Sequence, residues 1–376
     1  MFEKNFNSSI ILRYLYYGFF MKNKLSQYRK KIDDIDKKIL NLLNERAENA
    51  VEIGKIKQTS SVVYVPSRET EVINNLVKNN EGPLTKQDIT YIYREIIGVC
   101  RGLESKLKIA YLGPKATFSY QASLKQFGSK VDFIPVKRLS DVIEEVEKHR
   151  ADFAVVPIEN SNEGSVNTTL DELVDTNLKV VNEINMRVSH CLLSKTKLEN
   201  IKVVYSHHQA IAQCSGWLRK NLPYAELFPV NSTAHAAQLA CQNSKAAAIS
   251  SEVAAKIYNL NVLVKSIEDS KDNWTRFFVL GYGKTSETGN DKTSIIFTIK
   301  DKVSTLYNIL SEFSKNKINL TKIESRPTKK KVWQYMFFID FEGHICDKKV
   351  SDTLERINEH CIFLKILGSY PKADLI

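Results

Sequence analysis

The sequence predicts a multidomain protein in which an all-α block precedes an α/β block and a final α+β block. Apolar residues recur every three or four positions up to about residue 107, a spacing typical of amphipathic helices. Short apolar runs then alternate with helical stretches to about residue 284, which is the pattern of an α/β domain. From about residue 292 the expected order is β-α-β-β-α-β, which is ferredoxin-like.

The composition is that of a globular protein of the reducing cytosol. Hydrophobic residues make up 43% and charged residues 26% of the 376 positions. The six cysteines are scattered without a C-x-x-C pair, which argues against a disulfide framework or a zinc cluster. We therefore expect a cytoplasmic protein without a metal.

The formal net charge of +11 does not by itself indicate a nucleic-acid binder. Nucleic-acid binding needs basic residues clustered on a recognisable motif, whereas the lysines here are spread through the chain. The one tight run, Lys329–Lys331, is interpreted as a solvated loop. We expect no nucleic-acid partner, and small anionic substrates would suit a basic protein equally well.

Residues 1–21 are expected to lie outside the fold. The apolar stretch Ile10–Phe20 is interrupted by Arg13 and is about half of the ~20 residues that span a bilayer. No cleavage site of small residues follows it, so a signal peptide is not indicated. We expect no membrane association and interpret the segment as an extension, unstructured or untranslated, with Met21 as the alternative start.

The helical block, residues 22–107, is expected to hold three helices. Ile32, Ile35, Ile39 and Leu42 mark one face of a long first helix that ends near Ser60 and Ser61. A second helix follows Pro66, and a third contains Ile89, Ile92, Ile96 and Val99 after the break at Gly82 and Pro83. Such a block is too thin to fold as a monomer. An intertwined homodimer, or a higher homo-oligomer, is therefore expected.

Cations continue the apolar face of the first helix. The face reaches Arg46 one heptad after Ile39, and Lys57 lies eleven residues further on, about three turns. An unpaired cation in a buried seam costs several kcal/mol, so these side chains need anionic partners. Internal carboxylates and a small dicarboxylate ligand are both open as that partner.

The ordered set Arg29, Asn44–Arg46, Ile53–Lys57, Val65–Glu69 and Tyr93–Ile97 resembles the all-helical chorismate mutases. Their pericyclic reaction needs a held conformer and a donor to the ether oxygen, with no nucleophile. The resemblance implies that Arg29, Arg46 and Arg68 bind the substrate carboxylates. It also implies that Lys57 donates to the ether oxygen and that Glu69 binds the ring hydroxyl. The implied mutase site comprises Arg29, Arg46, Lys57, Val65, Arg68, Glu69, Cys100 and Glu104.

Three of these positions need comment. Arg29 and Arg46 are about 25 Å apart along a straight helix, so Arg29 is expected to enter the partner's site. Cys100 stands where some members have serine and offers a weaker contact. Glu104 stands where some members have a glutamine that donates to the ether oxygen, and a carboxylate can donate only when protonated. Mutase activity is therefore expected to fall as the pH rises.

The α/β block, residues 108–286, is expected to contain parallel sheets with the site at the strand carboxyl ends. The predicted strands are Ile109–Leu112, Phe153–Val156, Val203–Tyr205 and Ala246–Ile249, and the predicted crossover helices are Ser140–Lys148 and Ala234–Gln242. The segments Ala110–Ser119, Val155–Ser161, Val204–His207 and Thr275–Phe277 resemble prephenate dehydratases. That resemblance implies two α/β lobes around a cleft, like a periplasmic binding protein, and no cofactor.

The dehydratase resemblance makes Thr275 the donor to the leaving hydroxyl. The implied dehydratase site comprises Asn160, Ser161, Thr168, Ser206, Gln213, Thr275 and Arg276. Several alternatives remain open: Arg276 can pair with a core carboxylate instead, and Glu159 can cap a turn. Cys214 is interpreted as a buried apolar residue. His207 and His208 are expected to point to opposite faces and so not to share a metal.

The final block, residues 292–376, follows a linker at Gly289–Asp291. Its predicted strands are Ser294–Ile299, Asn319–Glu324, Gln334–Phe341 and Phe363–Leu367, and its predicted helices are Leu306–Lys315 and Asp352–Glu359. The segment Leu320–Pro327 resembles the E-S-R-P motif of the ACT regulatory domain, which implies phenylalanine as an allosteric ligand at a dimer interface. The implied regulatory residues are Ser304, Leu306, Glu324, Ser325, Arg326 and Pro327.

One regulatory element departs from the family pattern. Ser304-Thr305-Leu306 stands where the ACT domain has a Gly-Ala-Leu turn. Serine and a β-branched threonine should crowd a position where glycine allows close approach of a ligand. Weak sensing of phenylalanine is therefore expected.

The order of the three blocks resembles the bifunctional chorismate mutase/prephenate dehydratases. The resemblance implies that chorismate is rearranged to prephenate, which then loses water and carbon dioxide to give phenylpyruvate for phenylalanine biosynthesis. A non-catalytic amino-acid sensor is the alternative, but it does not explain the cations of the helical seam or the hydroxyl set ending in Thr275. A nucleic-acid binder rests on charge alone.

Overall fold

A computed structural model describes residues 6–57, 65–104, 106–300, 302–327 and 335–373. The chain divides into two compact units, Met1–Ser61 and Val62–Ile376, and each is described by itself. The break expected at Ser60 and Ser61 and the lysine run Lys329–Lys331 lie outside the described residues. Within them, no helix is both long enough and apolar enough to cross a membrane.

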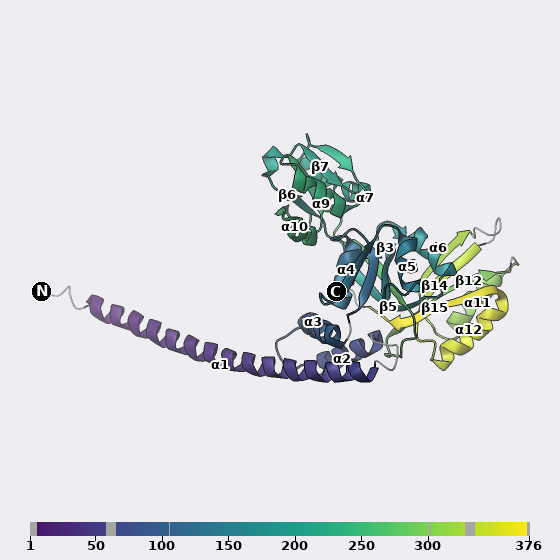
Figure 1. Ribbon diagram of the computed structural model, residues 1–376, viewed down its shortest axis with the longest axis horizontal. Helices are drawn as coiled ribbons and strands as arrows, with labels where there is room; N and C mark the ends of the chain where they lie inside the picture. Colours follow the sequence, from purple (N-terminus) through teal and green to yellow (C-terminus); the bar gives the residue numbers. More distant parts are fainter. Residues whose placement is uncertain (1–5, 58–64, 105, 301, 328–334, 374–376) are drawn as a thin grey trace. The chain divides into compact units, whose positions relative to one another are not determined.

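The first unit is the single helix α1, Phe6–Lys57, of 52 residues (Figure 1). The sequence led us to expect an unstructured or untranslated extension over residues 1–21, whereas the structure continues α1 back to Phe6. The apolar face that the sequence predicts is exposed: Ile32 is 56%, Ile35 52% and Leu42 64% accessible to solvent. An apolar stripe of this kind requires a partner surface.

The second unit begins with two helices, α2 (Pro66–Lys78) and α3 (Lys86–Glu104), as predicted. Pro66 starts α2, where its missing N–H costs nothing. Before α3, Thr85 Oγ1 accepts from the Asp88 backbone N at 3.2 Å, and the Asp88 carboxylate accepts from the Thr85 backbone N at 2.9 Å. This reciprocal cap fixes the start of α3 after the Gly82–Pro83 break.

A six-stranded sheet forms the first lobe of the α/β block. Its order is β2-β1-β3-β11-β5, with β4 paired to β3. The strands are β1 (Lys108–Leu112), β2 (Asp132–Val136), β3 (Phe153–Asn160), β4 (Gly164–Ser165), β5 (Lys179–Arg187) and β11 (Trp274–Gly281). The helices are α4 (Phe118–Phe127), α5 (Leu139–Glu147) and α6 (Asn167–Asp175). The expected parallel sheet is in fact mixed, because β11 runs antiparallel to both β3 and β5.

A five-stranded sheet of order β10-β6-β9-β7-β8 forms the second lobe. Its strands are β6 (Cys191–Ser194), β7 (Val203–Ser206), β8 (Glu226–Pro229), β9 (Ala246–Ser250) and β10 (Asn261–Val264). Its helices are η1 (Leu198–Asn200), α7 (His208–Gln213), α8 (Ser215–Asn221), α9 (Thr233–Gln242) and α10 (Glu252–Tyr258). The chain enters this lobe after β5 and returns to the first sheet at β11, so two connections join the lobes.

The final block is a four-stranded antiparallel sheet of order β13-β14-β12-β15 with two helices. Its elements are β12 (Asp291–Ile299), α11 (Thr305–Lys315), β13 (Leu320–Pro327), β14 (Tyr335–Glu342), α12 (Lys348–His360) and β15 (Cys361–Pro371). The predicted β-α-β-β-α-β order is confirmed. The linker is one residue shorter than expected, because Asp291 already belongs to β12.

Both faces of this four-stranded sheet are buried. Phe337, Ile339 and Phe341 of β14 pack with residues of α11 and α12. The alternate residues Met336 and Phe338 pack into the core of the first lobe. A Cβ at Gly368 of β15 would clash with the Val180 carbonyl oxygen of β5, so only glycine permits this approach. The final block is therefore built onto the first lobe.

Candidate active site

A cavity of about 470 Å³ is lined by residues from both lobes of the α/β block. The first lobe contributes Asn160 at the end of β3 and Thr275 in β11. The second lobe contributes His207 and Gln213, at the two ends of α7. Residues of the connections, such as Asn273, complete the wall. The cavity thus lies where the sequence places a cleft.

Thr275 and Asn160 meet across the antiparallel pair β3–β11, where they are direct neighbours in register. The Asn160 Nδ2 donates to Thr275 Oγ1 at 2.9 Å and to Asn273 Oδ1 at 2.8 Å. The Asn160 Oδ1 accepts from the backbone N of Asn162 at 3.0 Å and of Glu163 at 3.2 Å. The predicted residues Asn160 and Thr275 are therefore in direct contact. Asn160 also contacts Asn273, which was not predicted as a site residue.

Gln213 continues this polar chain from the second lobe. Its Oε1 accepts from Asn273 Nδ2 at 3.0 Å and lies 2.9 Å from His190 Nε2. Its Nε2 donates to Glu163 Oε1 at 3.4 Å. His190 is 2% exposed, and burial lowers its pKa, so the neutral imidazole is favoured. The side chains of Asn160, Gln213 and Thr275 are thus brought together, as predicted.

Two helices begin at the cavity, one from each lobe. Thr117 caps α4 by accepting from the Tyr120 backbone N at 3.3 Å, and Ser232 caps α9 by accepting from the His235 backbone N at 3.0 Å. Unpaired N–H groups and the helix dipole make such ends suited to carboxylates. The prediction missed these caps as site residues. A Ser or Thr directly before a helical run was the available signal.

Four predicted dehydratase residues are not among the side chains that line the cavity: Ser161, Thr168, Ser206 and Arg276. Ser206 is fully buried and donates to the Ile249 carbonyl at 2.7 Å, which joins two strands. Ser161 accepts from the Trp274 backbone N at 2.9 Å and so supports the strand that carries Thr275. Thr168 is exposed at the start of α6, while its neighbour Thr169 is buried. All four residues therefore stay expectations as direct ligands.

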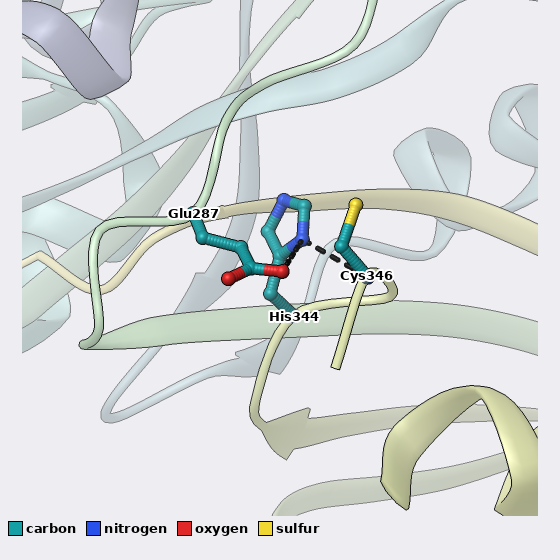
Figure 2. A group of neighbouring side chains, drawn as sticks. All are labelled: Glu287, His344 and Cys346. Atoms are coloured by element: carbon teal, nitrogen blue, oxygen red, sulfur yellow. Dashed lines mark hydrogen bonds and ion pairs between the residues drawn. The ribbon is translucent and has the colours of Figure 1, made fainter. Parts of the chain in front are cut away.

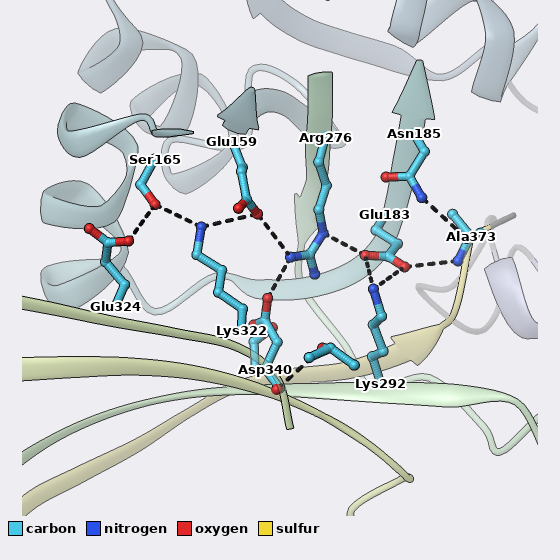
Figure 3. Close-up of polar contacts among 12 residues, drawn as sticks. Glu159, Ser165, Glu183, Asn185, Arg276, Lys292, Lys322, Glu324, Asp340 and Ala373 are labelled. Carbon is cyan, nitrogen blue, oxygen red and sulfur yellow. Dashed lines mark hydrogen bonds and ion pairs between the residues drawn. The ribbon is translucent and has the colours of Figure 1, made fainter. Parts of the chain in front are cut away.

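Arg276 is not among the residues that line the cavity, and its side chain lies in a buried ionic cluster (Figure 3). Its Nε lies 2.6 Å from Glu183 Oε2, its guanidinium also pairs with Asp340 at 2.5 Å, and its side chain is 11% exposed. The structure therefore shows the alternative that the sequence left open, pairing with core carboxylates, and the expected role of Arg276 in substrate binding stays a prediction. Successive residues of a strand face opposite sides of the sheet. Because Thr275 faces the cavity, Arg276 faces the final block.

The E-S-R-P segment of β13 also divides between two faces. Glu324 accepts from Ser165 Oγ at 2.9 Å, and Arg326 pairs with Asp171 of α6 at 2.9 Å. Lys322, two residues before Glu324 on the same face, lies 3.1 Å from Glu159 Oε2 (Figure 3). Glu159 therefore pairs with cations instead of capping a turn. Ser325 and Pro327 on the other face are exposed. Half of the predicted regulatory motif is thus engaged by the first lobe, and Ser165 also lines the cavity.

Ser304 occupies the position where the sequence lacks the family glycine. Its backbone has φ 66° and ψ 3°, which is the left-handed region, at the N-terminus of α11. A residue with a Cβ is strained by about 1–2 kcal/mol in this region. Leu306 lies in the first turn of the same helix.

The mutase residues are spread over both units. Arg29, Arg46 and Lys57 lie on α1. On α2, Glu69 pairs with the buried Arg101 of α3, and Arg101 NH2 also donates to the Phe127 carbonyl at 2.7 Å. The prediction missed Arg101, although an arginine on the apolar face of a helix was a signal.

The remaining mutase residues differ in exposure. Arg68 makes an exposed pair with Glu71 at 2.7 Å, a contact that contributes little. Val65 precedes α2 and is half-buried. Cys100 is buried and Glu104 is half-buried on α3. Each of these side chains therefore sits at or near a helix terminus or on the packed face of a helix.

The cysteine and histidine predictions have different outcomes. Cys214 is fully buried and burial raises the pKa of its thiol, which confirms the apolar interpretation. His207 and His208 do not point to opposite faces, because their ring centroids are 4.2 Å apart. The reason is that His207 caps α7 and His208 is its first residue, so the pair is not extended.

The described residues contain one group with metal-ligand chemistry: Glu287, His344 and Cys346 (Figure 2). His344 is 3% exposed, and its Nδ1 is 4.0 Å from Glu287 Oε1. That same Nδ1 already accepts from the Cys346 backbone N at 3.2 Å. Because the lone pair needed for a metal is used locally, we assign no ion to this group.

Comparison with known proteins adds a family context. The chain matches the profile of chorismate mutase type II over residues 28–105 and that of prephenate dehydratase over residues 109–285. The bifunctional chorismate mutase/prephenate dehydratase of Aquifex aeolicus is 48% identical over 358 residues, which is 94% of this chain and 99% of that protein. The protein of that name from Pseudomonas aeruginosa is 41% identical with the same coverage, 94% and 99%.

Among solved structures, the prephenate dehydratase from Arthrobacter aurescens in complex with L-Phe is similar to this chain. Its TM-score is 0.67 and its sequence identity 34%, over 72% of this chain and 92% of that one.

Proposed function

The chain belongs to the family of bifunctional chorismate mutase/prephenate dehydratases, and on that basis we propose which residues carry its two reactions. The protein rearranges chorismate to prephenate and then converts prephenate to phenylpyruvate on the route to phenylalanine. The observation that supports the dehydratase assignment best is the contact of Thr275 with Asn160 in the cavity between the lobes.

In the dehydratase step, prephenate loses its ring carboxylate and its ring hydroxyl together. The bond from the ring to the carboxylate carbon breaks, its electron pair enters the ring, and the bond from the ring to the hydroxyl oxygen breaks. Carbon dioxide leaves, the oxygen takes up one proton to leave as water, and the ring becomes aromatic. In this proposal Thr275, which lines the cavity, donates a hydrogen bond to that oxygen. Its hydroxyl is too weak an acid to act alone, so solvent supplies the proton.

The two carboxylates of prephenate need separate partners. The N-termini of α4 and α9 line the cavity from opposite lobes, and each offers backbone N–H groups. A dianion bridging these ends would draw the lobes together and exclude water. Gln213 and Asn160 would then contact the substrate between the two ends.

In the mutase step, the protein holds the diaxial conformer of chorismate and stabilises the ether oxygen as its bond breaks. We assign the carboxylates to Arg29, Arg46 and Arg68, and the ether oxygen to Lys57 and Glu104. Glu69 accepts from the ring hydroxyl, and its pair with Arg101 fixes the direction of its carboxylate. By the same resemblance to chorismate mutases we assign Val65 and Cys100 to the mutase reaction.

The final block is assigned as an ACT domain that binds phenylalanine at a subunit interface. The relative from Arthrobacter aurescens was solved with L-Phe. The β-α-β-β-α-β order and the exposed Ser325 support this assignment. The exposed apolar face of α1, with Ile32, Ile35 and Leu42, supports a homodimer in which α1 is shared.

The test is to supply chorismate to purified protein and to follow prephenate and phenylpyruvate. Lys57→Ala should abolish the first step but leave added prephenate convertible. Thr275→Ala should let prephenate accumulate. The assignment fails if either variant runs both steps at the rate of the unaltered protein. Conversion of Lys195, an exposed lysine of the second lobe, to alanine serves as the matched control and should change neither rate.

A further inference from the structure

We propose that Asn273 is a positioning residue for the dehydratase reaction: acting through Asn160, it points the hydroxyl hydrogen of Thr275 at the substrate. The inference rests on the proposed role of Thr275. It adds a residue that belongs to neither the predicted site nor the assignments above.

Two backbone N–H groups, whose hydrogen-bonding direction is fixed, set the orientation of the Asn160 amide. The backbone N–H groups of Asn162 and Glu163 can only donate, and both approach the Asn160 side-chain oxygen, at 3.0 and 3.2 Å. The Asn160 Oδ1 is therefore the acceptor, and its Nδ2 must face the other way. This orientation follows from the partners and not from the appearance of the amide.

The orientation passes from Asn160 to Asn273. The Asn160 Nδ2 lies 2.8 Å from the Asn273 side chain, so that atom must be the acceptor Oδ1. The Asn273 Nδ2 is then directed at Gln213, whose Oε1 accepts at 3.0 Å. Asn273 is 1% exposed, so no solvent competes for these contacts.

The last side chain in this row of hydrogen bonds is His190. Since Gln213 presents its oxygen, His190 Nε2 must carry a hydrogen to approach it at 2.9 Å. The imidazole is thereby held as the Nε2–H tautomer, and its burial favours the neutral form. Every amide and ring in the row from Asn160 to His190 thus has one consistent direction.

The consequence for Thr275 concerns its hydrogen. The hydroxyl oxygen accepts from Asn160 Nδ2 at 2.9 Å, so its own hydrogen cannot point at that amide. Among the described residues, the structure shows no acceptor for that hydrogen. It is free to turn into the cavity, where the departing hydroxyl of the substrate would lie. A donor fixed before the reaction stabilises the transition state without reorganisation.

Asn273 matters because Asn160 Nδ2 has two hydrogens and three nearby acceptors, Asn273 Oδ1, Thr275 Oγ1 and the Trp274 carbonyl at 3.2 Å. With Asn273 holding one hydrogen, the other is shared by Thr275 and the carbonyl. Without Asn273, the amide can rotate toward the carbonyl and release the threonine. The hydroxyl would then no longer be held by Asn160, and its hydrogen would lose its fixed direction toward the cavity.

The experiment compares Asn273→Ala and Asn273→Asp in the full chain, with prephenate as the added substrate. The alanine variant should lower dehydratase kcat by about tenfold to a hundredfold, the loss of one well-placed hydrogen bond. The aspartate variant keeps an oxygen for Asn160, so its kcat should lie nearer to the unaltered protein. Its KM should rise, because the new carboxylate repels a dianion. Mutase activity in the same chain reports on folding.

A double variant separates positioning from general damage. In a Thr275→Ala background, Asn273→Ala should cause no further loss of kcat, because it acts through the missing hydroxyl. Asn185→Ala, which removes a part-buried amide of β5 that donates to the Ala373 carbonyl at 3.2 Å, is the matched control and should leave kcat unchanged.

Two results would overturn the inference: unaltered kcat in both Asn273 variants, or the same fractional loss with and without Thr275. A Thr275→Ala protein that dehydrates prephenate normally would instead refute the proposed function. The outcomes are therefore distinguishable.

Discussion

Replacing Arg276 by methionine should destabilise the junction between the first lobe and the final block. The guanidinium contacts Glu183, Asp340 and the Tyr370 hydroxyl, and the two carboxylate side chains are 0% and 8% exposed. Removing one partner of a buried ion pair costs about 3–5 kcal/mol, since the remaining charge stays unpaired. Lys292, at 3.1 Å from Glu183, still neutralises one carboxylate, so we expect the lower end of that range.

The assay is urea unfolding followed by tryptophan fluorescence. With a slope of about 3 kcal/mol per molar urea, a loss of ~3 kcal/mol lowers the midpoint by about 1 M. The matched control is Arg150→Met, because Arg150 pairs with Glu145 at 2.6 Å while 53% exposed. An exposed pair contributes about 0–1 kcal/mol, so its midpoint should move by a few tenths of a molar at most.

Equal midpoints for the two variants would refute this reasoning, because they would mean that burial adds nothing to the Arg276 contacts. A large rise in KM for prephenate with an unchanged midpoint would also refute it. That result would return Arg276 to the substrate-binding role that the sequence first indicated.

Three further predictions follow from single residues. Ser304→Gly relieves about 1–2 kcal/mol of left-handed strain but loses about 0.4–1 kcal/mol to chain entropy, so thermal unfolding should show a gain of ~1 kcal/mol and calorimetry should show tighter phenylalanine binding; weaker binding would contradict it. A thiol reagent should label the exposed Cys346 quickly and the buried Cys214 only on unfolding, as peptide mass spectrometry can check. Because burial lowers the pKa of His190 below its unfolded value near 6.5, the unfolded state binds more protons and stability should fall as the pH drops below about 6.5; His190→Gln should flatten this trend in urea midpoints between pH 7.5 and 5.5, and an identical trend would count against it.

The helices α2, α3, α5, α9, α11 and α12 and the block order were predicted because their signals are local. Pro66 and the Gly82–Pro83 break punctuate the helical block, and the structure begins α2 and α3 close to them. The β-α-β-β-α-β order of the final block follows from alternating runs of similar length. Such signals depend on neighbours within a few residues, so one sequence is enough to read them.

The strand β5 is one of several strands of the α/β block that were not predicted, and the reason is that some of its buried residues are polar. β5 includes Asn182 and Glu183, which look like surface residues but are 7% and 2% exposed. The partner of Glu183, for example, is Lys292 of the final block, which lies more than a hundred residues away in the sequence. A polar residue whose partner is distant in sequence cannot be told from a solvated one by pattern alone.

The site was predicted in its centre but not at its edges. Thr275, Asn160 and Gln213 share one cavity, whereas Arg276 belongs to another contact. Asn273 carried no signal, since its importance lies in the direction of its amide. Hydrogen-bond direction depends on several chains of contacts at once, and a sequence does not record it.

The tripeptide Thr275-Arg276-Phe277 is best understood as two interleaved signatures. Its outer letters face the cavity, and its middle letter is anchored to the next domain. In a genetic screen for phenylalanine auxotrophs, substitutions at all three positions would fall into one class. Only substitutions at Thr275 would act on the reaction itself. A second-site change at Asp340 should restore growth only for substitutions at Arg276, because Asp340 is its ion-pair partner.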